Sequence, residues 1–311
     1  MSSKLAFVFP GQGSQQVGML ADYLSEPLVQ STLKEASDVL GYDLQALISE
    51  GPADQLNRTE NAQPALLAAS VALWRLWCDR RGEAPAVMAG HSLGEYSALT
   101  CAGAMNFADA IKLVHLRGLY MQEAVAAGEG AMAAILGLDD ADVVAVCEKV
   151  AAEDVVEAVN FNAPGQVVIA GRVVAVQRAI EEAKAMGAKR AIELPVSVPS
   201  HCALMRPAAE KLKNELAGIQ VVAPMIPVVQ NVSADFCSDP EQLKANLVAQ
   251  LYSPVRWVES IEAIIATGVG RFAECGPGKV LAGLNKRIAR RAPIATFESA
   301  DVMAQWLAEA N

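Results

Sequence analysis

The sequence predicts an α/β protein whose parallel sheet is interrupted by a smaller α+β domain. Over residues 1–126, short apolar runs of strand length alternate with longer segments of helical periodicity, the order found in a parallel sheet covered on both faces. The middle of the chain follows a different order: strand, helix, strand, strand, helix, strand. Because 53% of the 311 residues are hydrophobic and only 19% are charged, the chain can form a large folded core.

The first part of the large domain is expected to contain two strands. Lys4–Phe9 is a short apolar run that ends at Pro10-Gly11, and 86–89 is a second run that ends at a glycine. Helices are expected at 29–49, 63–80 and 93–104, and from residue 106 or 109 to about 126.

The middle segment predicts an inserted ferredoxin-like domain at roughly 127–198. Its strands are expected at 130–138, 155–161, 166–170 and 190–196, and its helices at 139–152 and 173–187. This βαββαβ order is that of the split βαβ unit. Because strands and helices resume after Pro199, the large domain is predicted to be discontinuous, comprising 1–126 and 199–311.

Composition and charge exclude several classes of protein. The net charge of −10 disfavours nucleic acid as the main partner. No apolar run has the length of a membrane span, and the N-terminal apolar stretch is too short for a signal peptide, so we expect a cytoplasmic protein without a membrane partner. The six cysteines are scattered without a Cys-x-x-Cys pair, so we expect reduced thiols and no metal site.

Residues 90–94 carry a candidate nucleophile, Ser92. They read Gly-His-Ser-Leu-Gly and match the Gly-x-Ser-x-Gly turn, in which a strand leads into a helix. Glycines are needed there because the backbone is strained and the helix passes close to the turn. The hydroxyl then stands at a helix N-terminus, where free N–H groups can stabilise an oxyanion. In the alternative interpretation, Ser92 is an ordinary helix cap.

A serine nucleophile needs a base, and the chain offers three histidines. His91 is adjacent to Ser92, so at a sharp turn its side chain should point away from the hydroxyl. His115 lies inside a predicted helix and is expected to be structural. His201 follows Pro199 on a loop, where catalytic groups tend to sit, and is the candidate base by elimination.

A glycine loop follows the first strand. Its segment Pro10-Gly11-Gln12-Gly13 could offer a backbone N–H to an oxyanion hole. A dinucleotide-binding loop is the alternative, but Gln16 stands where the third glycine of Gly-x-Gly-x-x-Gly belongs, and no Walker lysine follows. We therefore reject nucleotide binding.

Arg117 lies within the apolar stripe of its predicted helix, so its guanidinium is expected to be buried or to face a cleft. A buried charge without a partner is costly, so this arginine requires a carboxylate. From the stripe alone, a structural ion pair, for example with Glu95, is the simpler explanation. The alternative is a substrate carboxylate held by two parallel hydrogen bonds.

Several motifs stand in a distinctive order along the chain. They are FPGQGSQ at 9–15, NAQPA at 61–65, GHSLGE at 90–95, Arg117, VPSH at 198–201 and ECGPGK at 274–279. Together they resemble the malonyl-CoA:acyl carrier protein transacylases of type II bacterial fatty acid synthesis. The resemblance covers essentially the whole chain and implies an α/β-hydrolase-like acyltransferase core with an inserted ferredoxin-like domain.

The resemblance implies transfer of a malonyl group from malonyl-CoA to the phosphopantetheine thiol of acyl carrier protein, which feeds fatty acid chain elongation. The group would be carried on Ser92, with His201 as the base and coenzyme A as the first product. The main-chain carbonyl that orients the histidine would be that of Gln250, which matches the corresponding position of the family. The oxyanion hole would consist of the N–H groups of Gln12 and Leu93.

The same resemblance assigns Arg117 to the free malonyl carboxylate, which reverses the preference stated above. It implies no cofactor, and we expect a monomer. Other positions match residues that line the cleft: Gln63, His91, Asn160, Asn162 and Ser200.

Residues 276–297 form a local basic segment in an acidic chain, without any Asp or Glu. Since the carrier proteins of this pathway are acidic, we expect the segment to dock the carrier protein. The alternative is a solvated helix face. The candidate docking residues are Lys286, Arg287, Arg290 and Arg291.

Two other functions could use the same residues. A serine hydrolase would use Ser92 and His201 with water as the acceptor, but the lack of an obvious triad acid and the presence of Arg117 favour transfer. A non-catalytic binding subunit of a larger synthase would need neither the serine nor the histidine.

Overall fold

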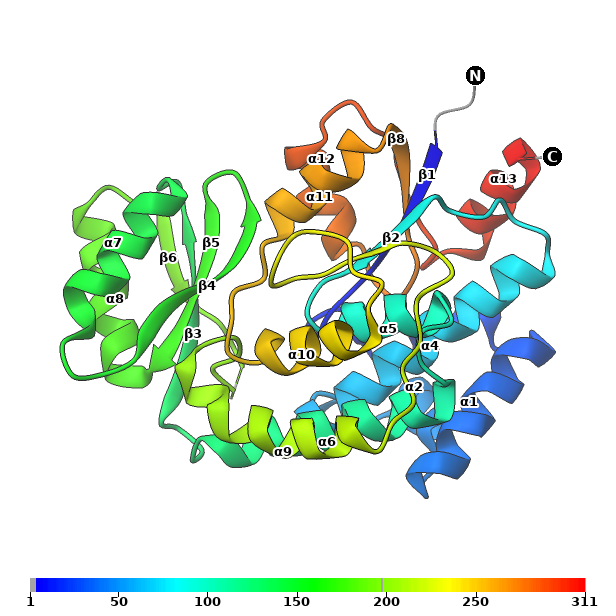
Figure 1. The fold of residues 1–311 in the computed structure, drawn as a ribbon, viewed down its shortest axis with the longest axis horizontal. Helices are drawn as coiled ribbons and strands as arrows, with labels where there is room; N and C mark the ends of the chain where they lie inside the picture. Colours follow the sequence, from blue (N-terminus) through cyan, green and yellow to red (C-terminus); the bar gives the residue numbers. More distant parts are fainter. Residues whose placement is uncertain (1–3, 197, 311) are drawn as a thin grey trace.

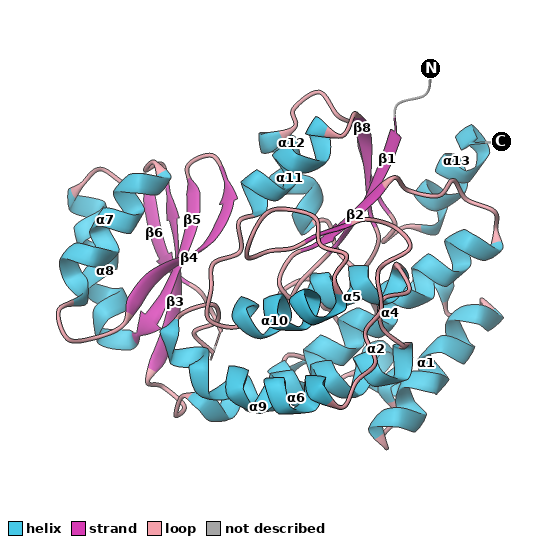
Figure 2. Ribbon diagram, viewed as in Figure 1, coloured by secondary structure: helices cyan, strands magenta, loops and turns pink. Residues whose placement is uncertain are grey.

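The computed structural model describes residues 4–196 and 198–310; the parts of the predicted domains at residues 1–3, 197 and 311 lie outside this range. Two sheets organise the fold (Figures 1 and 2). The larger sheet has the strand order β7-β2-β1-β8-β9, and every neighbouring pair is parallel. The predicted α/β class with a parallel sheet is therefore confirmed. Its strands are β1 (Lys4–Phe9), β2 (Val87–Gly90), β7 (Val228–Val229), β8 (Val269–Glu274) and β9 (Ile294–Thr296).

β1 lies at the centre of this sheet and is buried on both faces. Leu5, Phe7 and Phe9 join one hydrophobic cluster, while Ala6 and Val8 join another. Because successive side chains of a strand point to opposite faces, helices must cover both sides of the sheet. The helices of the large domain are α1 (Pro27–Leu40), α2 (Leu44–Glu50), α3 (Ala53–Leu56), α4 (Thr59–Asp79), α5 (Leu93–Cys101), α6 (Phe107–Ala124), α9 (Arg206–Ala217), α10 (Pro240–Gln250), α11 (Trp257–Ala266), α12 (Val280–Ile288) and α13 (Ala300–Ala310).

The segment 29–49, predicted as a continuous helical region, contains two helices. Gly41 ends α1 with a φ of 76°, a left-handed conformation that favours glycine. Asp43 then begins α2, because its carboxylate accepts a hydrogen bond from the N–H of Ala46. A glycine cap and an aspartate cap in close succession therefore divide the region.

α4 begins at Thr59 rather than at residue 63, so it contains Pro64. A proline has no N–H, so Pro64 cannot donate the usual helical hydrogen bond to the carbonyl four residues earlier, that of Glu60. His115 donates instead: its Nδ1 lies 2.9 Å from Glu60 O, and a carbonyl oxygen can only accept. His115 therefore compensates for the proline and holds α6 against α4.

The smaller sheet lies beside the large domain, and all of its strand pairs are antiparallel (Figure 1). Its strand order is β4-β5-β3-β6, which together with the βαββαβ sequence confirms the predicted ferredoxin-like fold. Helices α7 (Asp140–Ala151) and α8 (Val173–Ala185) pack on the sheet. The limits of the inserted domain, 127–198, stay a prediction. Its strands are β3 (Gly130–Leu136), β4 (Val156–Ala163), β5 (Gln166–Arg172) and β6 (Arg190–Glu193).

No helix in the described part of the chain is long and apolar enough to cross a membrane.

Candidate active site

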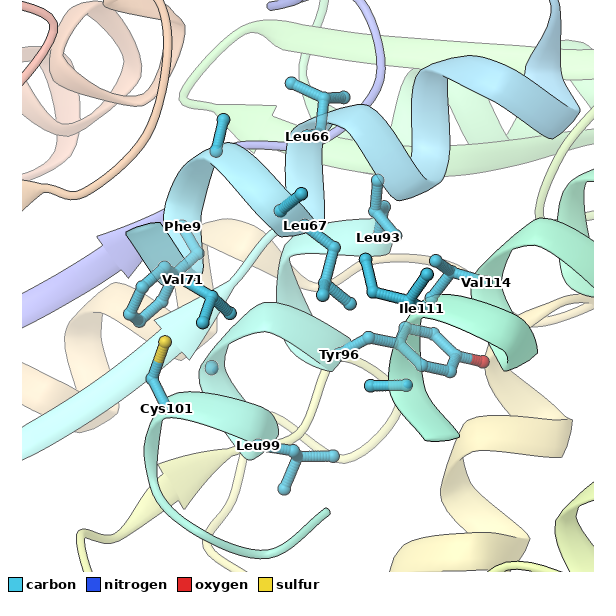
Figure 3. Close-up of a cluster of buried hydrophobic side chains, with 14 of the residues drawn as sticks. Phe9, Leu66, Leu67, Val71, Leu93, Tyr96, Leu99, Cys101, Ile111 and Val114 are labelled. Carbon is cyan, nitrogen blue, oxygen red and sulfur yellow. The ribbon is translucent and has the colours of Figure 1, made fainter. Parts of the chain in front are cut away.

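Helix α5, which follows β2 directly, is packed on all sides. Eight of its nine residues are buried. Figure 3 shows the side chains that meet around it, including Leu66, Leu67, Leu93, Tyr96, Leu99, Ile111 and Val114 from α4, α5 and α6. Because protein interiors are close-packed, such a helix cannot shift easily. Its N-terminus is therefore a rigid platform.

Ser92 stands in the turn between β2 and α5. Its φ of 51° and ψ of −110° are rarely adopted by L-residues, at a cost of about 1–3 kcal/mol. A Cβ on Gly90 would lie 1.8 Å from the carbonyl carbon of Gly94, and a Cβ on Gly94 would lie 2.0 Å from Phe9 O. Close packing thus explains both glycines. The Ser92 hydroxyl makes no capping hydrogen bond to α5, so the interpretation as an ordinary helix cap is wrong.

His201 lies against the serine. Its Nε2 is 2.8 Å from Ser92 Oγ, and its Nδ1 is 2.7 Å from the main-chain oxygen of Gln250. Because a carbonyl oxygen can only accept, Nδ1 carries the ring proton, and Nε2 can accept from the Ser92 hydroxyl. The group that orients the histidine is thus a neutral carbonyl.

The backbone and the electrostatic environment of His201 are also unusual. The residue is 3% exposed, has a φ of 68°, and donates its N–H to Leu251 O at 2.9 Å. Burial and the nearby Arg117 cation lower the pKa of His201 to about 3. His201 is therefore neutral near pH 7 and able to accept a proton.

Arg117, on α6, is 1% exposed and reaches the serine. Its Nη2 lies 3.2 Å from Ser92 Oγ and 3.0 Å from Gln250 Oε1, and its Nη1 lies 2.8 Å from Gln63 Oε1. Among the described residues no Asp or Glu forms an ion pair with it, and its Nε has no hydrogen-bond partner. The ion pair with Glu95 is not formed, because Glu95 Oε2 accepts instead from Gln250 Nε2 at 2.9 Å. The Gln250 carboxamide therefore lies between the Arg117 guanidinium and the Glu95 carboxyl group.

A cleft of about 200 Å³ opens onto Ser92, with walls from the large domain and from the small sheet. Gln63 and Gln250 are fully buried and contact the Arg117 guanidinium from outside this cleft. The fold thus brings together all the predicted catalytic, oxyanion-hole and substrate-binding residues. Those that line the cleft are Gln12, His91, Ser92, Leu93, Arg117, Asn160, Asn162, Ser200 and His201.

Two backbone N–H groups remain available beside the serine. Within residues 4–196 and 198–310, neither Gln12 nor Leu93 donates its N–H to another protein group. Leu93 is the first residue of α5, where N–H groups lack helical partners. A Cβ on Gly11 would lie 2.5 Å from His91 O, so the glycine loop packs directly on the turn. The His91 side chain points away, as expected, with Nε2 2.8 Å from Asn162 Oδ1.

Arg287, one of the predicted docking residues, already has protein partners. It contacts the side chain of Gln166 and donates to Pro164 O at 2.8 Å, at the turn between β4 and β5. It therefore ties α12 to the small domain, a contact that the sequence did not suggest. All four predicted docking residues are exposed on α12 or just after it: Lys286, Arg287, Arg290 and Arg291.

Asn231 was missed by sequence reasoning. It follows β7 and is 1% exposed, and its Oδ1 lies 2.8 Å from the N–H nitrogen of Ser92. Glu95 belongs to the same network, and burial raises its pKa to about 7. Polar residues at the carboxyl end of a parallel strand often mark a site. The strand itself, Val228–Val229, is too short to be recognised from periodicity.

Ser92 lies at the carboxyl edge of a parallel sheet and is hydrogen-bonded to a neutral histidine. A serine in this arrangement can accept an acyl group and transfer it to a second acceptor. The fold and this site define the protein as an acyltransferase. The chain belongs to the acyl transferase family: the family model described as the acyl transferase domain matches residues 6–306.

Similarity to named proteins extends over nearly the whole chain. The malonyl CoA-acyl carrier protein transacylase of Escherichia coli (strain K12) is 60% identical over 287 residues, covering 92% of this chain and 93% of that protein. The protein of the same name from Bacillus subtilis (strain 168) is 49% identical over 314 residues, covering 99% of each.

Solved structures of malonyltransferases are also similar to this chain over nearly its whole length. The acyl carrier protein S-malonyltransferase of Vibrio cholerae matches with a TM-score of 0.96 at 56% identity, over 97% of this chain and 99% of that one. A malonyl-transacylase solved in complex with a type II PKS acyl-carrier protein matches with a TM-score of 0.97 at 55% identity, over 99% of this chain and 100% of that one.

Proposed function

We propose that this chain transfers a malonyl group from malonyl-CoA to the phosphopantetheine thiol of acyl carrier protein, and so feeds fatty acid chain elongation. The observation that carries the proposal is the buried Arg117 guanidinium, which lies 3.2 Å from Ser92 Oγ and has no ion-pair partner in the described chain. A malonyl group on Ser92 presents the carboxylate that this arginine requires. The similar proteins named above, which include one in complex with a carrier protein, support the same acyl group and acceptor.

In the first half-reaction, Ser92 Oγ attacks the thioester carbonyl carbon while His201 Nε2 takes the hydroxyl proton. The N–H groups of Gln12 and Leu93 donate to the oxyanion that forms. The carbon–sulfur bond then breaks, and the proton on His201 passes to the departing thiolate. Malonyl-Ser92 remains, and coenzyme A leaves as a neutral thiol.

In the second half-reaction, the carrier-protein thiol gives its proton to His201 Nε2 and attacks the ester carbon. Ser92 Oγ leaves and recovers the proton. The Gln250 carbonyl accepts the Nδ1–H of His201 in both half-reactions, so the ring keeps its orientation.

The malonyl carboxylate also changes the electrostatics of the base. The Arg117 cation is one cause of the low pKa of His201. A bound carboxylate offsets that cation, so the pKa of His201 rises when malonyl is present. The histidine thus becomes a stronger base with the correct acyl group in the cleft.

The other predicted residues have supporting roles. The Gln63 and Gln250 side chains hold the guanidinium in place. The proposal uses a nucleophile, a base and oxyanion donors, and so needs no cofactor. It needs no second copy of the chain, because every residue that it uses belongs to one chain. We also propose that the reaction takes place in the cytoplasm. The six free cysteines support this location, because thiols stay reduced there. The remaining predicted residues line the cleft, beside the path of the acyl group and its thiol carrier: His91, Asn160, Asn162 and Ser200.

Incubation with malonyl-CoA alone is expected to leave a malonyl ester on Ser92, detected by intact-protein mass spectrometry and peptide mapping. Added carrier protein should then remove the ester much faster than water does, because the enzyme uses a thiol acceptor. A serine hydrolase would lose the ester to water whether or not carrier protein is present. A binding subunit would form no ester. Either result would contradict the proposal.

Lys286→Glu/Arg290→Glu is expected to raise the KM for carrier protein and to leave the KM for malonyl-CoA unchanged. The reason is electrostatic steering, which added salt should weaken because the Debye length is ~10 Å at 0.1 M. Arg287 is kept because it ties α12 to the small domain. Lys112→Glu/Lys213→Glu, at exposed positions of α6 and α9, is the control with the same change in net charge. Equal effects on both substrates, or an equal effect of the control pair, would exclude this docking surface.

A further inference from the structure

The strained backbone of Ser92 needs a group that holds it. With φ at 51° and ψ at −110°, the turn is outside the conformations that a free chain prefers. The glycines on either side allow the close approach of β2 and α5, but they contribute no side chain that could fasten the turn. The fastening group must therefore come from elsewhere in the fold.

Asn231 provides two hydrogen bonds across this turn. Its Oδ1 accepts the N–H of Ser92 at 2.8 Å, and its Nδ2 donates to Gly90 O at 2.7 Å. One carboxamide thus joins the end of β2 to the serine itself. Asn231 is 1% exposed and does not line the substrate cleft, so the carboxamide is a buried brace rather than a substrate ligand.

The brace is in turn held by Glu95 on α5. Glu95 Oε2 accepts the N–H of Asn231 at 2.9 Å and also Gln250 Nε2 at 2.9 Å. Gln250 Nε2 reaches Ser92 O at 3.0 Å, and its main-chain oxygen orients His201. One buried carboxylate therefore links the residue that braces the serine to the residue that orients the histidine.

We propose that Asn231 is a positioning residue for Ser92, which holds the turn so that the hydroxyl meets His201 Nε2. This inference rests on the proposed function, in which Ser92 is the nucleophile. The bond to Oδ1 also occupies the Ser92 N–H, so the N–H of Leu93 is the donor that remains at this turn for the oxyanion.

The test is the single-turnover rate constant for acylation of Ser92 by malonyl-CoA. Asn231→Ala removes both hydrogen bonds and should lower this rate constant about 10- to 100-fold, because a buried N–H and a buried carbonyl lose their partners. Saturation with malonyl-CoA should occur at the same concentration as in the wild type. The matched control is Gln230→Ala, which truncates the neighbouring buried carboxamide. That group bonds weakly to Val228 O at 3.4 Å and, among the described residues, makes no hydrogen bond to the turn.

Asn231→Asp gives a second, independent readout. A protonated aspartic acid has one O–H donor and one acceptor, as the carboxamide has on this turn, whereas the ionised form cannot donate to Gly90 O. The charged groups that face it are Glu95 on α5, which Asn231 contacts directly, Arg117 on α6, which acts on Glu95, and Arg256, whose main-chain N–H donates to Asn231 O at 3.2 Å. Burial and Glu95 favour the protonated form, and Arg117 opposes it. The acylation rate of this variant relative to wild type should therefore rise from about pH 8 to about pH 6, and that of Asn231→Ala should not.

The outcomes separate this inference from the function on which it rests. If the wild-type chain forms no malonyl ester, the proposed function fails. If the wild type is acylated and Asn231→Ala is acylated as fast, or no more slowly than Gln230→Ala, Asn231 does not position the serine. If the acylation rate of Asn231→Asp relative to wild type does not change with pH, the inference is overturned as well. This measurement alone tests the inference if Asn231→Ala does not fold.

Discussion

Ser92→Ala is expected to abolish the covalent ester and to lower malonyl transfer by roughly four or more decades. The substitution removes one oxygen, whose bond to the malonyl carbonyl carbon forms in the first half-reaction and breaks in the second, so no second group can take its place. The fold should persist, because the hydroxyl does not cap α5 and the helix is packed on all sides. His201→Ala should lose most of the rate for the related reason that the serine proton then has no acceptor.

Intact-protein mass spectrometry after malonyl-CoA addition, a transfer assay and a thermal melt together measure this result. Ser97→Ala is the matched control, since Ser97 is a buried serine on the same helix whose Oγ has no hydrogen-bond partner among the residues that the structure describes. It should retain the ester and the transfer rate. Undiminished transfer by Ser92→Ala would end the covalent mechanism.

Arg117→Ala is expected to lower kcat/KM for malonyl-CoA by at least about 100-fold, while kcat/KM for acetyl-CoA holds steady or rises. Malonyl and acetyl differ by one carboxylate, and removing one partner of a buried ion pair costs about 3–5 kcal/mol, or roughly two to four decades in rate. Acetyl leaves the buried arginine without an ion-pair partner, so the wild-type site rejects it. Removing Arg117 also removes a cause of the low pKa of His201, which makes that base stronger for acetyl transfer.

Both substrates should be compared at about pH 8, above the ordinary histidine pKa, so that His201 is neutral in every variant. Arg117→Lys should restore malonyl transfer only in part, because an ammonium lacks the planar fork that binds a carboxylate with two hydrogen bonds. If malonyl and acetyl transfer fall together in Arg117→Ala, the arginine is structural, and the malonyl assignment loses its main physical support.

The parts of this protein that were predictable from sequence depend on nearby residues. The turn at 90–94 is local, since its glycines are needed where β2 and α5 approach each other. The ferredoxin-like unit was predictable because its strands and helices follow one another without a gap. The break at Gly41 is not visible in the apolar periodicity, which continues on both sides of it, because the break depends on the left-handed backbone of a single glycine.

Contacts between distant segments were harder to predict. Asn231 is separated from Ser92 by 139 positions, and it follows a strand of only two residues. The contact of Arg287 with the β4–β5 turn likewise joins segments more than a hundred residues apart. Neither pairing leaves a trace in local periodicity, because the groups meet only after the sheet has assembled.

The sequence by itself determined that Ser92 lies between a strand and a helix and that Arg117 is on the buried face of its helix. Both follow from residues within a few positions of each other. Only the tertiary structure decided what Arg117 contacts. Gln63 from α4 and Gln250 from α10 place two amides around the guanidinium, and the second keeps the Glu95 carboxylate one amide away. The partner of a buried charge is set by how distant elements pack, and the periodicity of one helix contains no information about that packing.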